Sequence, residues 1–168
     1  MCMGTPALVS VEEYLRHRDK PSSEYIDGVL HPKAMPTTPH GRMQWMLLML
    51  LNKFGIEALP EITLRLSPTK FLIPDVIAAK HIESPYPTEP GLLCVEILSP
   101  EDGVGSMLGK CEEYHAWGVP FCWVIDPIKK VAWEYPLGGE PTRIGGTGNL
   151  QAGEITVSLD ELFSSVNN

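Results

Sequence analysis

Two acidic residues of this chain lie inside apolar segments. Asp75 lies within FLIPDVIAA (71–79), and Glu96 lies within LLCVEILS (92–99). A carboxylate is seldom buried without a partner, and an ionised one in an apolar site is costly unless it is paired, protonated or bound to a metal. Two of them on neighbouring strands indicate a shared site, and a cation is the simplest way to hold both. The pair is therefore the starting point for a metal-dependent active site.

Each of these acids also has a purely structural explanation. Asp75 follows a proline, so it could accept backbone hydrogen bonds at an irregular point of a strand. Glu96 has no turn beside it, so its structural alternative is a buried salt bridge. Both explanations stay open at this point.

A lysine and a third acid are further candidates for the same site. Lys110, Tyr114 and Trp117 are spaced i, i+4 and i+7, so they share one stripe of a predicted helix. If Tyr114 and Trp117 face the sheet, Lys110 can point toward the two carboxylates; the alternative is a lysine in solvent. Glu24 precedes a hairpin turn, and its alternatives are a surface acid or an ion-pair partner of Arg42 or Lys33.

Three other polar residues have structural interpretations that weigh at least as much as functional ones. His40 begins a helix and could either lie near the site or cap the helix. Tyr114 is a candidate hydrogen-bond donor behind the site, although a core tyrosine is the simpler interpretation. Asp126 precedes Pro127 at a strand end, which is typical of a turn.

The remaining patterns predict one mixed sheet with helices on both faces, in a single domain over residues 1–168. Strand, helix and strand between residues 92 and 126 form a crossover unit with parallel strands. The segment around MLLMLL (46–51) is apolar on nearly all sides and should be buried in the core or against a partner subunit. The predicted elements are a capped helix at 10–18, a hairpin at 24–35, a helix from Thr37 or Thr38 to Gly55, strands at 61–67, 71–79 and 92–99, a helix at 104–117, strands at 121–126 and 131–136, a Gly-rich segment of weak strand content, and a capped helix SLDELF.

Composition narrows the classes of function. A chain of 168 residues fits one soluble domain, and its net charge of −8 argues against a broad basic surface for nucleic acid while allowing a local basic patch. No apolar run is long enough to cross a membrane and no signal peptide is visible, so we expect no membrane partner and a cytoplasmic location. Four cysteines without paired spacing fit a reducing compartment.

The order of several short motifs resembles that of the Uma family, bacterial restriction-endonuclease-like proteins of the PD-(D/E)xK nuclease superfamily. The resemblance covers about residues 10 to 136. The motifs are Glu24-x-Ile26-Asp27-Gly28, His40 opening a helix, Pro74-Asp75-Val76, Val95-Glu96-Ile97-Leu98-Ser99-Pro100, Lys110, Tyr114, Gly118-Val119-Pro120 and Trp123-Val124-Ile125-Asp126-Pro127.

The resemblance implies a fold and a set of roles. The fold class would be α/β and restriction-endonuclease-like, with a central mixed sheet of at least four strands, flanking helices and added β-hairpins. Asp75 and Glu96 would ligate a divalent metal, Mg²⁺ or Mn²⁺, and Glu24 would be an additional acid. The superfamily lysine lies two positions after the second acid, where this chain has Leu98, so Lys110 would take its place from the next helix.

Three hypotheses follow from these observations. The first is a divalent-metal-dependent endonuclease that hydrolyses phosphodiester bonds, with DNA as the expected partner and a homodimer as the expected assembly. The second is a non-catalytic binding or assembly module that retains the nuclease fold, which Leu98 and the net charge of −8 favour. The third, a carboxylate-pair hydrolase such as a glycosidase, ranks last because no aromatic platform for a sugar is visible.

Overall fold

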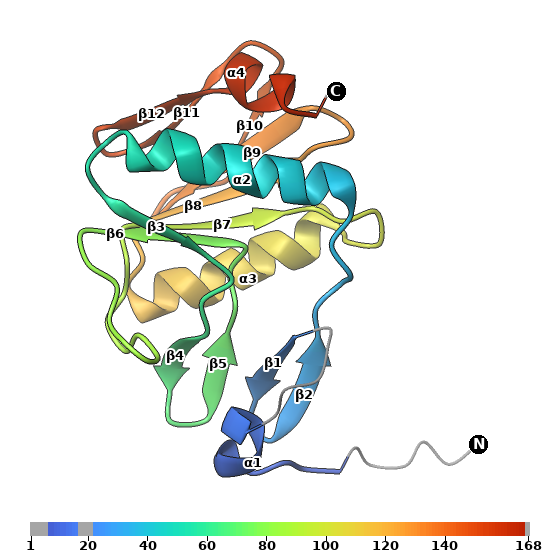
Figure 1. The fold of residues 1–168 in the computed structure, drawn as a ribbon, viewed down its shortest axis with the longest axis vertical. Coiled ribbons are helices and arrows are strands. Elements are labelled where there is room, and N and C mark those ends of the chain that lie inside the picture. The colour runs from blue at the N-terminus through green and yellow to red at the C-terminus, as the bar shows by residue number, and fades with distance from the viewer. Residues whose placement is uncertain (1–6, 17–21, 167–168) are drawn as a thin grey trace.

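Helices cover both faces of a central sheet in the computed structural model, which describes residues 7–16 and 22–166 (Figure 1). The helices are α1 (Val11–Arg16), α2 (Thr38–Asn52), α3 (Val104–Trp117) and α4 (Leu159–Ser164). The strands are β1 (Ser23–Ile26), β2 (Val29–Pro32), β3 (Glu57–Pro60), β4 (Leu64–Ser67), β5 (Lys70–Leu72), β6 (Val76–Ala79), β7 (Leu93–Ile97), β8 (Phe121–Asp126), β9 (Val131–Pro136), β10 (Thr142–Gly145), β11 (Asn149–Ala152) and β12 (Ile155–Ser158).

The central sheet has six strands in the order β10-β9-β8-β7-β6-β3. Strands β7 and β8 are parallel and joined through α3, which confirms the predicted crossover, and the other neighbours are antiparallel. A four-stranded sheet, β2-β1-β5-β4, lies with α1 below the central sheet in Figure 1, and β11 pairs with β12. No helix in the described part of the chain is long and apolar enough to span a membrane.

Alternation along β7 assigns its side chains to two separate cores. Val95 and Ile97 pack with the buried side of α2, whereas Cys94 and Leu98 pack with α3. Because successive side chains of a strand point to opposite faces, Glu96 lies on the α3 side. This register brings its carboxylate to the helix that carries Lys110.

The segment FLIPDVIAA was predicted as one strand, and the structure corrects this. It forms β5 in the four-stranded sheet and β6 in the central sheet, with Ile73, Pro74 and Asp75 between them. Proline has no N–H to donate to a strand ladder, so the chain leaves one sheet at this point and enters the other. Asp75 therefore lies at the junction of two sheets rather than in the middle of a strand.

Other differences concern strands that depend on their neighbours. The strand predicted at 61–67 begins only at Leu64, and β3 was not predicted because EALP shows no clear alternation. Strand β3 exists through antiparallel pairing with β6, in which Ala58 lies opposite Ala78. The Gly-rich segment contains two strands, β10 and β11, which exceeds the weak strand content predicted for it, and β12 follows it directly.

Turn and cap predictions agree with the structure. Ser10 and Glu13 form the reciprocal capping box, with Ser10 N donating to Glu13 Oε2 at 2.9 Å and Glu13 N donating to Ser10 Oγ at 3.2 Å. The last positions predicted for this helix, 17 and 18, lie outside the described residues. The Asp27-Gly28 turn has φ of 48° and 92°, as a tight hairpin requires.

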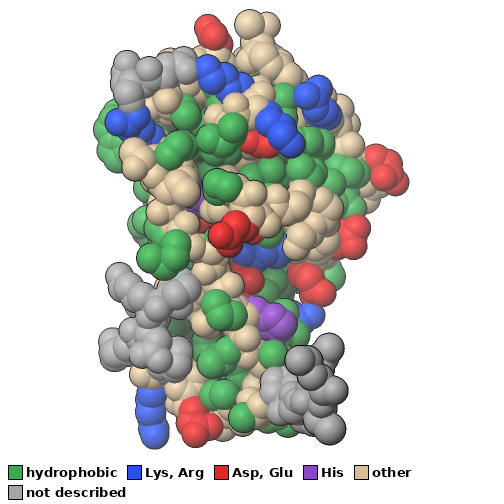
Figure 2. All heavy atoms as spheres, turned by 90° about the vertical axis from the view of Figure 1, so that its right-hand side faces the viewer, with side chains coloured by type: hydrophobic (Ala, Val, Ile, Leu, Met, Phe, Trp, Pro, Cys, Tyr) green, Lys and Arg blue, Asp and Glu red, His purple; other side chains and the backbone are tan. Residues whose placement is uncertain are grey.

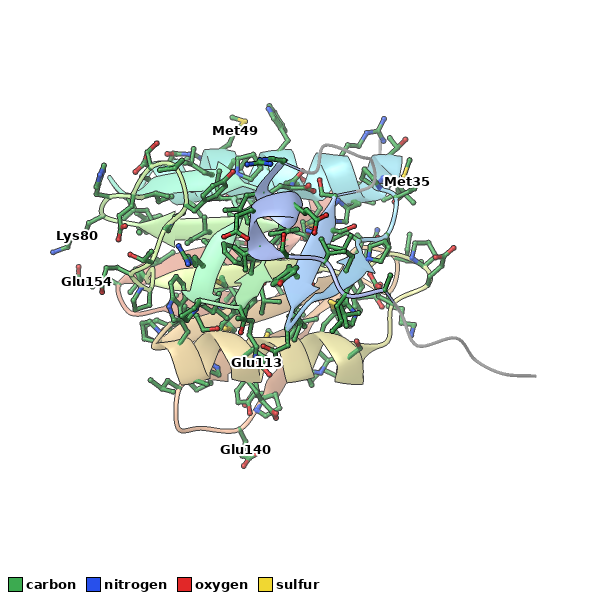
Figure 3. The ribbon with its side chains drawn as sticks, turned by 90° about the horizontal axis from the view of Figure 1, so that it is seen from below. Met35, Met49, Lys80, Glu113, Glu140 and Glu154 are labelled. Carbon is green, nitrogen blue, oxygen red and sulfur yellow. The ribbon has the colours of Figure 1, made fainter. Side chains whose placement is uncertain are left out.

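Helix α2 begins as predicted but is less buried than predicted. Met43, Leu47 and Leu51 are fully buried, whereas Trp45 is 58% exposed and Met49 is 45% exposed. Figure 3 shows Met49 pointing outward from the molecule. The prediction that the helix is buried in the core is thus wrong for the side that carries Trp45 and Met49. The alternative, that a partner subunit of a homodimer covers this side, stays a prediction.

Gly118 ends α3 in a conformation that other residues rarely adopt, and this makes a stability prediction. Its φ is +118°, and an added Cβ would lie 3.2 Å from Pro90 Cγ. We expect Gly118→Ala to lower the free energy of unfolding by about 1–3 kcal/mol. Gly105→Ala is the control because its Cβ would meet nothing within 4 Å and alanine favours the helix. Urea unfolding measures both; equal stability of the two variants would contradict the prediction.

Candidate active site

Asp75 and Glu96 are brought side by side by the pairing of β6 with β7. Val76 lies opposite Val95, and continuing this antiparallel register by one residue places Asp75 opposite Glu96. The two residues are only 3% and 2% exposed. Like charges directly opposite each other on paired strands are destabilising, so both carboxylates need cationic or hydrogen-bonding partners.

The partners of Asp75 come from outside the central sheet and from β7. Lys33 Nζ donates to Asp75 Oδ1 at 2.8 Å, and His40 Nε2 lies 3.2 Å from Asp75 Oδ2. The backbone N–H of Ile97 also donates to Asp75 Oδ2 at 2.6 Å. Gln44 Nε2 holds the backbone carbonyl of Asp75 at 2.8 Å. Asp75 is thus held by side chain and backbone in one orientation.

The partners of Glu96 both come from α3. Lys110 Nζ lies 2.8 Å from Glu96 Oε1, and the Tyr114 hydroxyl donates to the same oxygen at 2.7 Å. Lys110 and Tyr114 are one helical turn apart, so the predicted stripe of α3 does face the carboxylates. Tyr114 is fully buried, so it is a core tyrosine and a hydrogen-bond donor to Glu96 at once.

Glu24 links the two sheets through Lys110. Its Oε1 lies 2.6 Å from Lys110 Nζ and accepts a hydrogen bond from the backbone N–H of Ile73 at 2.8 Å. The carbonyl of Ile73 accepts from both Lys33 (2.9 Å) and Lys110 (3.2 Å). The bend between β5 and β6 is therefore fixed by the same side chains that surround the acids.

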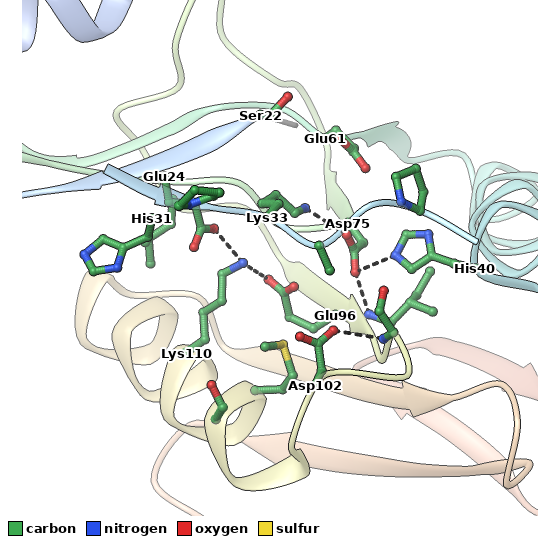
Figure 4. A pocket seen from close by; sticks show the side chains of 18 of the residues that line it. Ser22, Glu24, His31, Lys33, His40, Glu61, Asp75, Glu96, Asp102 and Lys110 are labelled. Carbon is green, nitrogen blue, oxygen red and sulfur yellow. Dashed lines mark hydrogen bonds and ion pairs between the residues drawn. The ribbon is translucent and has the colours of Figure 1, made fainter. Parts of the chain in front are cut away.

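These groups line a cavity of about 680 Å³. Figure 4 shows Lys110 pointing between Glu24 and Glu96, while Lys33 and His40 reach Asp75 from two sides. Figure 2 shows charged side chains of both signs and a histidine close together in the middle of one face of the molecule. The acids are thus buried by their surroundings but open onto a space that a ligand could enter.

The two neighbouring acids have opposite pKa shifts. Burial raises the pKa of Glu96 to about 7, and Asp75 adds to the rise while Lys110 opposes it. Burial also acts to raise the pKa of Asp75, but the contact with His40 and the charge of Lys33 outweigh it and hold the pKa well below its usual range. Burial would lower the pKa of Lys110, but Glu96 and Glu24 outweigh it and raise the pKa. Asp75 is ionised and Lys110 is a cation at neutral pH.

The raised pKa of Glu96 predicts how the stability of the metal-free protein depends on pH. At pH values between the usual pKa of a glutamate and about 7, Glu96 of the folded protein keeps a proton that the unfolded chain has lost. Its stabilising contribution is therefore fully present below the pKa of the unfolded chain and is lost as pH rises through the pKa of the folded protein. We expect wild type to lose about 2–3 kcal/mol relative to Glu96→Gln over this window.

Urea unfolding of both proteins in a chelator, at pH values from 4.5 to 8, measures this difference. The depressed pKa of Asp75 acts only at lower pH, since its contribution is present above the unfolded value and is lost as pH falls below it. A difference between wild type and Glu96→Gln that does not change with pH would contradict the prediction.

The structure brings together the four candidate residues Asp75, Glu96, Lys110 and Glu24. Both structural alternatives are also present, because Asp75 accepts a backbone hydrogen bond and Glu96 forms a buried ion pair. Glu24 pairs with Lys110 and with neither Arg42 nor Lys33 among the described residues. Leu98 is 6% exposed and packs in the core under α3.

Lys33 and His40 make contacts in the site that the sequence does not predict. The sequence offers Lys33 only as a partner of Glu24, and nothing in the HPKAMP segment indicates that it reaches Asp75, which is 42 positions away. His40 contacts Asp75, while the cap of α2 is Thr37, whose Oγ1 accepts from His40 N at 3.4 Å. Asp126 has the predicted turn role, because its Oδ1 accepts from the backbone N–H groups of Ile128 and Lys129.

The donor set of the cavity fits a hard divalent cation held by few protein ligands. Within the described ranges, no group of three or more His, Cys, Asp or Glu side chains is arranged as a metal cage. Among the acids that line the cavity, Asp75 and Glu96 lie opposite each other on paired strands, and Mg²⁺ commonly binds through one or two carboxylates while keeping several waters. The contacts that Glu96 receives both fall on Oε1, so Oε2 can serve as a ligand.

The mixed central sheet, with helices on both faces and added hairpins, is a restriction-endonuclease-like fold. The chain belongs to the Uma2 family, described as "Putative restriction endonuclease", whose family model matches residues 11–163. This confirms the family that the sequence motifs resemble.

Several solved structures are similar to the chain, among them the following two. One is described as the crystal structure of "a putative nuclease belonging to DUF820 from Anabaena variabilis"; it has a TM-score of 0.80 and 21% identity, with 94% of this chain and 99% of that chain covered. This likeness shows the fold. The other is a cryo-electron microscopy structure of a DrdV–DNA complex, with a TM-score of 0.42, 17% identity, and 60% and 9% of the two chains covered. That score is too low to support a conclusion. Comparison with the curated proteins finds no match.

Proposed function

We propose that this protein is a divalent-metal-dependent endonuclease that hydrolyses phosphodiester bonds in DNA. The observation that carries the proposal is the convergence of Asp75, Glu96 and Lys110 on one cavity. Lys110 Nζ lies 2.8 Å from Glu96 Oε1. Opposite pKa shifts on adjacent acids, as found for Asp75 and Glu96, are common at functional sites.

In this proposal Asp75 and Glu96 hold Mg²⁺ or Mn²⁺. When bound, such a cation makes an attacking water more acidic and neutralises charge on the phosphate. Asp75 is suited to this task because it stays ionised at neutral pH and its backbone is anchored by Gln44. The charge of the cation would also favour the ionised form of Glu96 and remove the repulsion between the two carboxylates.

Lys110 has the role of a fixed positive charge. Its raised pKa keeps the ammonium protonated at neutral pH, so it does not act as a base. Held by Glu24 and Glu96 on one wall of the cavity, it is placed to stabilise negative charge that develops on the scissile phosphate. Glu24 orients Lys110, which is a positioning role. Lys110 would thus supply the positive charge that a lysine supplies in the superfamily pattern at the position where this chain has Leu98.

DNA as the substrate is supported by the family description and by the fold shared with a protein described as a nuclease. The net charge of −8 indicates that contacts to the phosphate backbone are local rather than spread over the surface. Lys33 and Lys110 are the lysines that line the cavity, and each is paired with an acid in the metal-free protein.

A non-catalytic binding module is the second candidate, and one observation favours it. Lys33 and Lys110 already pair with Asp75 and Glu96 without a metal, so the charges of both acids are balanced as they stand. A module of this kind would bind its partner without cleaving it. Failure to bind Mn²⁺ in a calorimetric titration, with the fold intact, would favour this candidate.

A cleavage assay tests the proposal directly. Purified protein is incubated with supercoiled and linear DNA and with RNA, in Mg²⁺, in Mn²⁺ and in a chelator. We expect DNA cleavage with metal and none with chelator. Asp75→Ala, purified in the same way, controls for a contaminating nuclease and should be inactive. Absence of cleavage of any substrate with either metal would overturn the proposed activity.

A further inference from the structure

Lys33 forms an ion pair with Asp75, one of the two carboxylates that bind the metal in the proposed function. Its ammonium lies 2.8 Å from Asp75 Oδ1, and the side chains of Lys33 and Asp75 are 14% and 5% exposed. Its second contact is the Ile73 carbonyl at 2.9 Å. A cation approaching Asp75 from the cavity therefore meets a positive charge that is already in place.

The two lysines of the site are held with different strength. Lys110 contacts two carboxylates, those of Glu24 and Glu96, and projects from the regular helix α3. Lys33 contacts one carboxylate and lies beyond β2, in the irregular segment that leads to α2. Because each charge-assisted contact adds to the cost of moving a cation, Lys33 is the one that leaves first when a divalent ion arrives.

A displaced Lys33 would remain in the cavity. Its backbone N–H donates to the Ser22 carbonyl at 2.9 Å, which fixes the base of the side chain at the cavity wall. The four-carbon stem then allows the ammonium to turn from Asp75 to another anion nearby. In a phosphodiester substrate, that anion is a phosphate oxygen.

We propose that Lys33 is a built-in competitor for the metal at Asp75 and becomes a phosphate-binding residue once the metal has displaced it. This inference rests on the proposed function, since it concerns the same metal position. Lys33 thus prevents repulsion between two bare carboxylates in the metal-free protein and makes metal affinity lower than the acids alone would give. By linkage, whatever draws Lys33 away from Asp75 also favours metal binding.

Titration with Mn²⁺ by calorimetry, without nucleic acid, tests the competition. Lys33→Met removes the competing charge and is expected to tighten Mn²⁺ binding roughly tenfold, because a buried carboxylate left without its partner gains most from a new cation. Lys33→Arg keeps a cation with more hydrogen-bond donors and is expected to bind Mn²⁺ no more tightly than wild type. The control is Lys80→Met, because Lys80 is exposed and points outward on the side of the molecule opposite Met35, a residue of the cavity (Figure 3).

Each outcome decides between the two proposals. Tighter Mn²⁺ binding by Lys33→Met, with no tightening in Lys33→Arg or Lys80→Met, supports the competition. Equal binding by wild type and Lys33→Met overturns it and leaves the metal site standing. Absence of Mn²⁺ binding by all the proteins, with circular dichroism showing the fold, overturns the metal-dependent function and the competition with it. If Lys33→Met does not fold, Lys33→Arg still decides, since tighter binding by that variant would also overturn the proposal.

Binding of phosphate is tested separately on an oligonucleotide with Ca²⁺ in place of Mn²⁺. The logarithm of the binding constant falls with the logarithm of salt concentration in proportion to the phosphates that the protein neutralises. Removing one phosphate contact is expected to reduce this slope by about 1 in Lys33→Met and to leave it unchanged in Lys80→Met. An unchanged slope in Lys33→Met would overturn the phosphate-binding role.

Discussion

Replacing Glu96 by glutamine is expected to lower the rate of metal-dependent DNA cleavage by about 10³-fold or more. Glutamine keeps the size and the hydrogen bond from Tyr114 but removes the negative charge that the proposed metal position needs. The same change should leave the protein folded, because Lys110 retains Glu24 as an ionic partner at 2.6 Å. Loss of activity would therefore occur without loss of structure.

A matched substitution separates this effect from a general change of charge in the cavity. Glu113 also lines the cavity, but its carboxylate pairs with Lys70 of β5 and is far more exposed than that of Glu96. Glu113→Gln should cleave DNA at nearly the wild-type rate. Single-turnover rates in Mn²⁺ measure both variants. Full activity of Glu96→Gln would show that Glu96 has only a structural role.

Replacing Lys110 by methionine is expected to destabilise the protein by about 3–5 kcal/mol at pH 8, besides abolishing cleavage. Methionine has a similar length but no charge, so half-buried Glu24 and buried Glu96 would face each other without their shared cation. Burial raises the pKa of Glu96 and favours its protonated form, so the loss of stability should be smaller at pH 5. Urea unfolding at both pH values in a chelator measures this loss.

Two further variants establish the cause of that loss. Lys110→Met combined with Glu24→Gln removes one of the two carboxylates left without their cationic partner and should recover part of the lost stability. Lys53→Met is the control, because Lys53 is 63% exposed and its ion pair with Glu161, at 3.6 Å, is also exposed. An exposed pair of this kind contributes about 0–1 kcal/mol. If Lys110→Met were no less stable than Lys53→Met, the ion-pair network would not hold the two sheets together.

Local chemistry accounts for the parts of the fold that were predictable from sequence. The Asp27-Gly28 turn, the Ser10–Glu13 capping box and the end of α3 at Gly118 each depend on a few adjacent residues. Apolar runs with a crossover helix predicted the parallel pair β7 and β8. Strand β3 was not predictable in this way, because EALP becomes a strand only through pairing with β6.

The sequence by itself determined which residues could do chemistry, since an acid in an apolar segment is costly wherever that segment folds. It therefore identified Asp75 and Glu96, and helical spacing added Lys110 and Tyr114 on one stripe. Only the tertiary structure decided how these groups pair. The bend at Pro74 places Asp75 between two sheets, and contacts across long sequence separations bring Lys33 to Asp75 and Glu24 to Lys110. Pairings of this kind depend on how separate elements pack, which no local pattern of residues specifies.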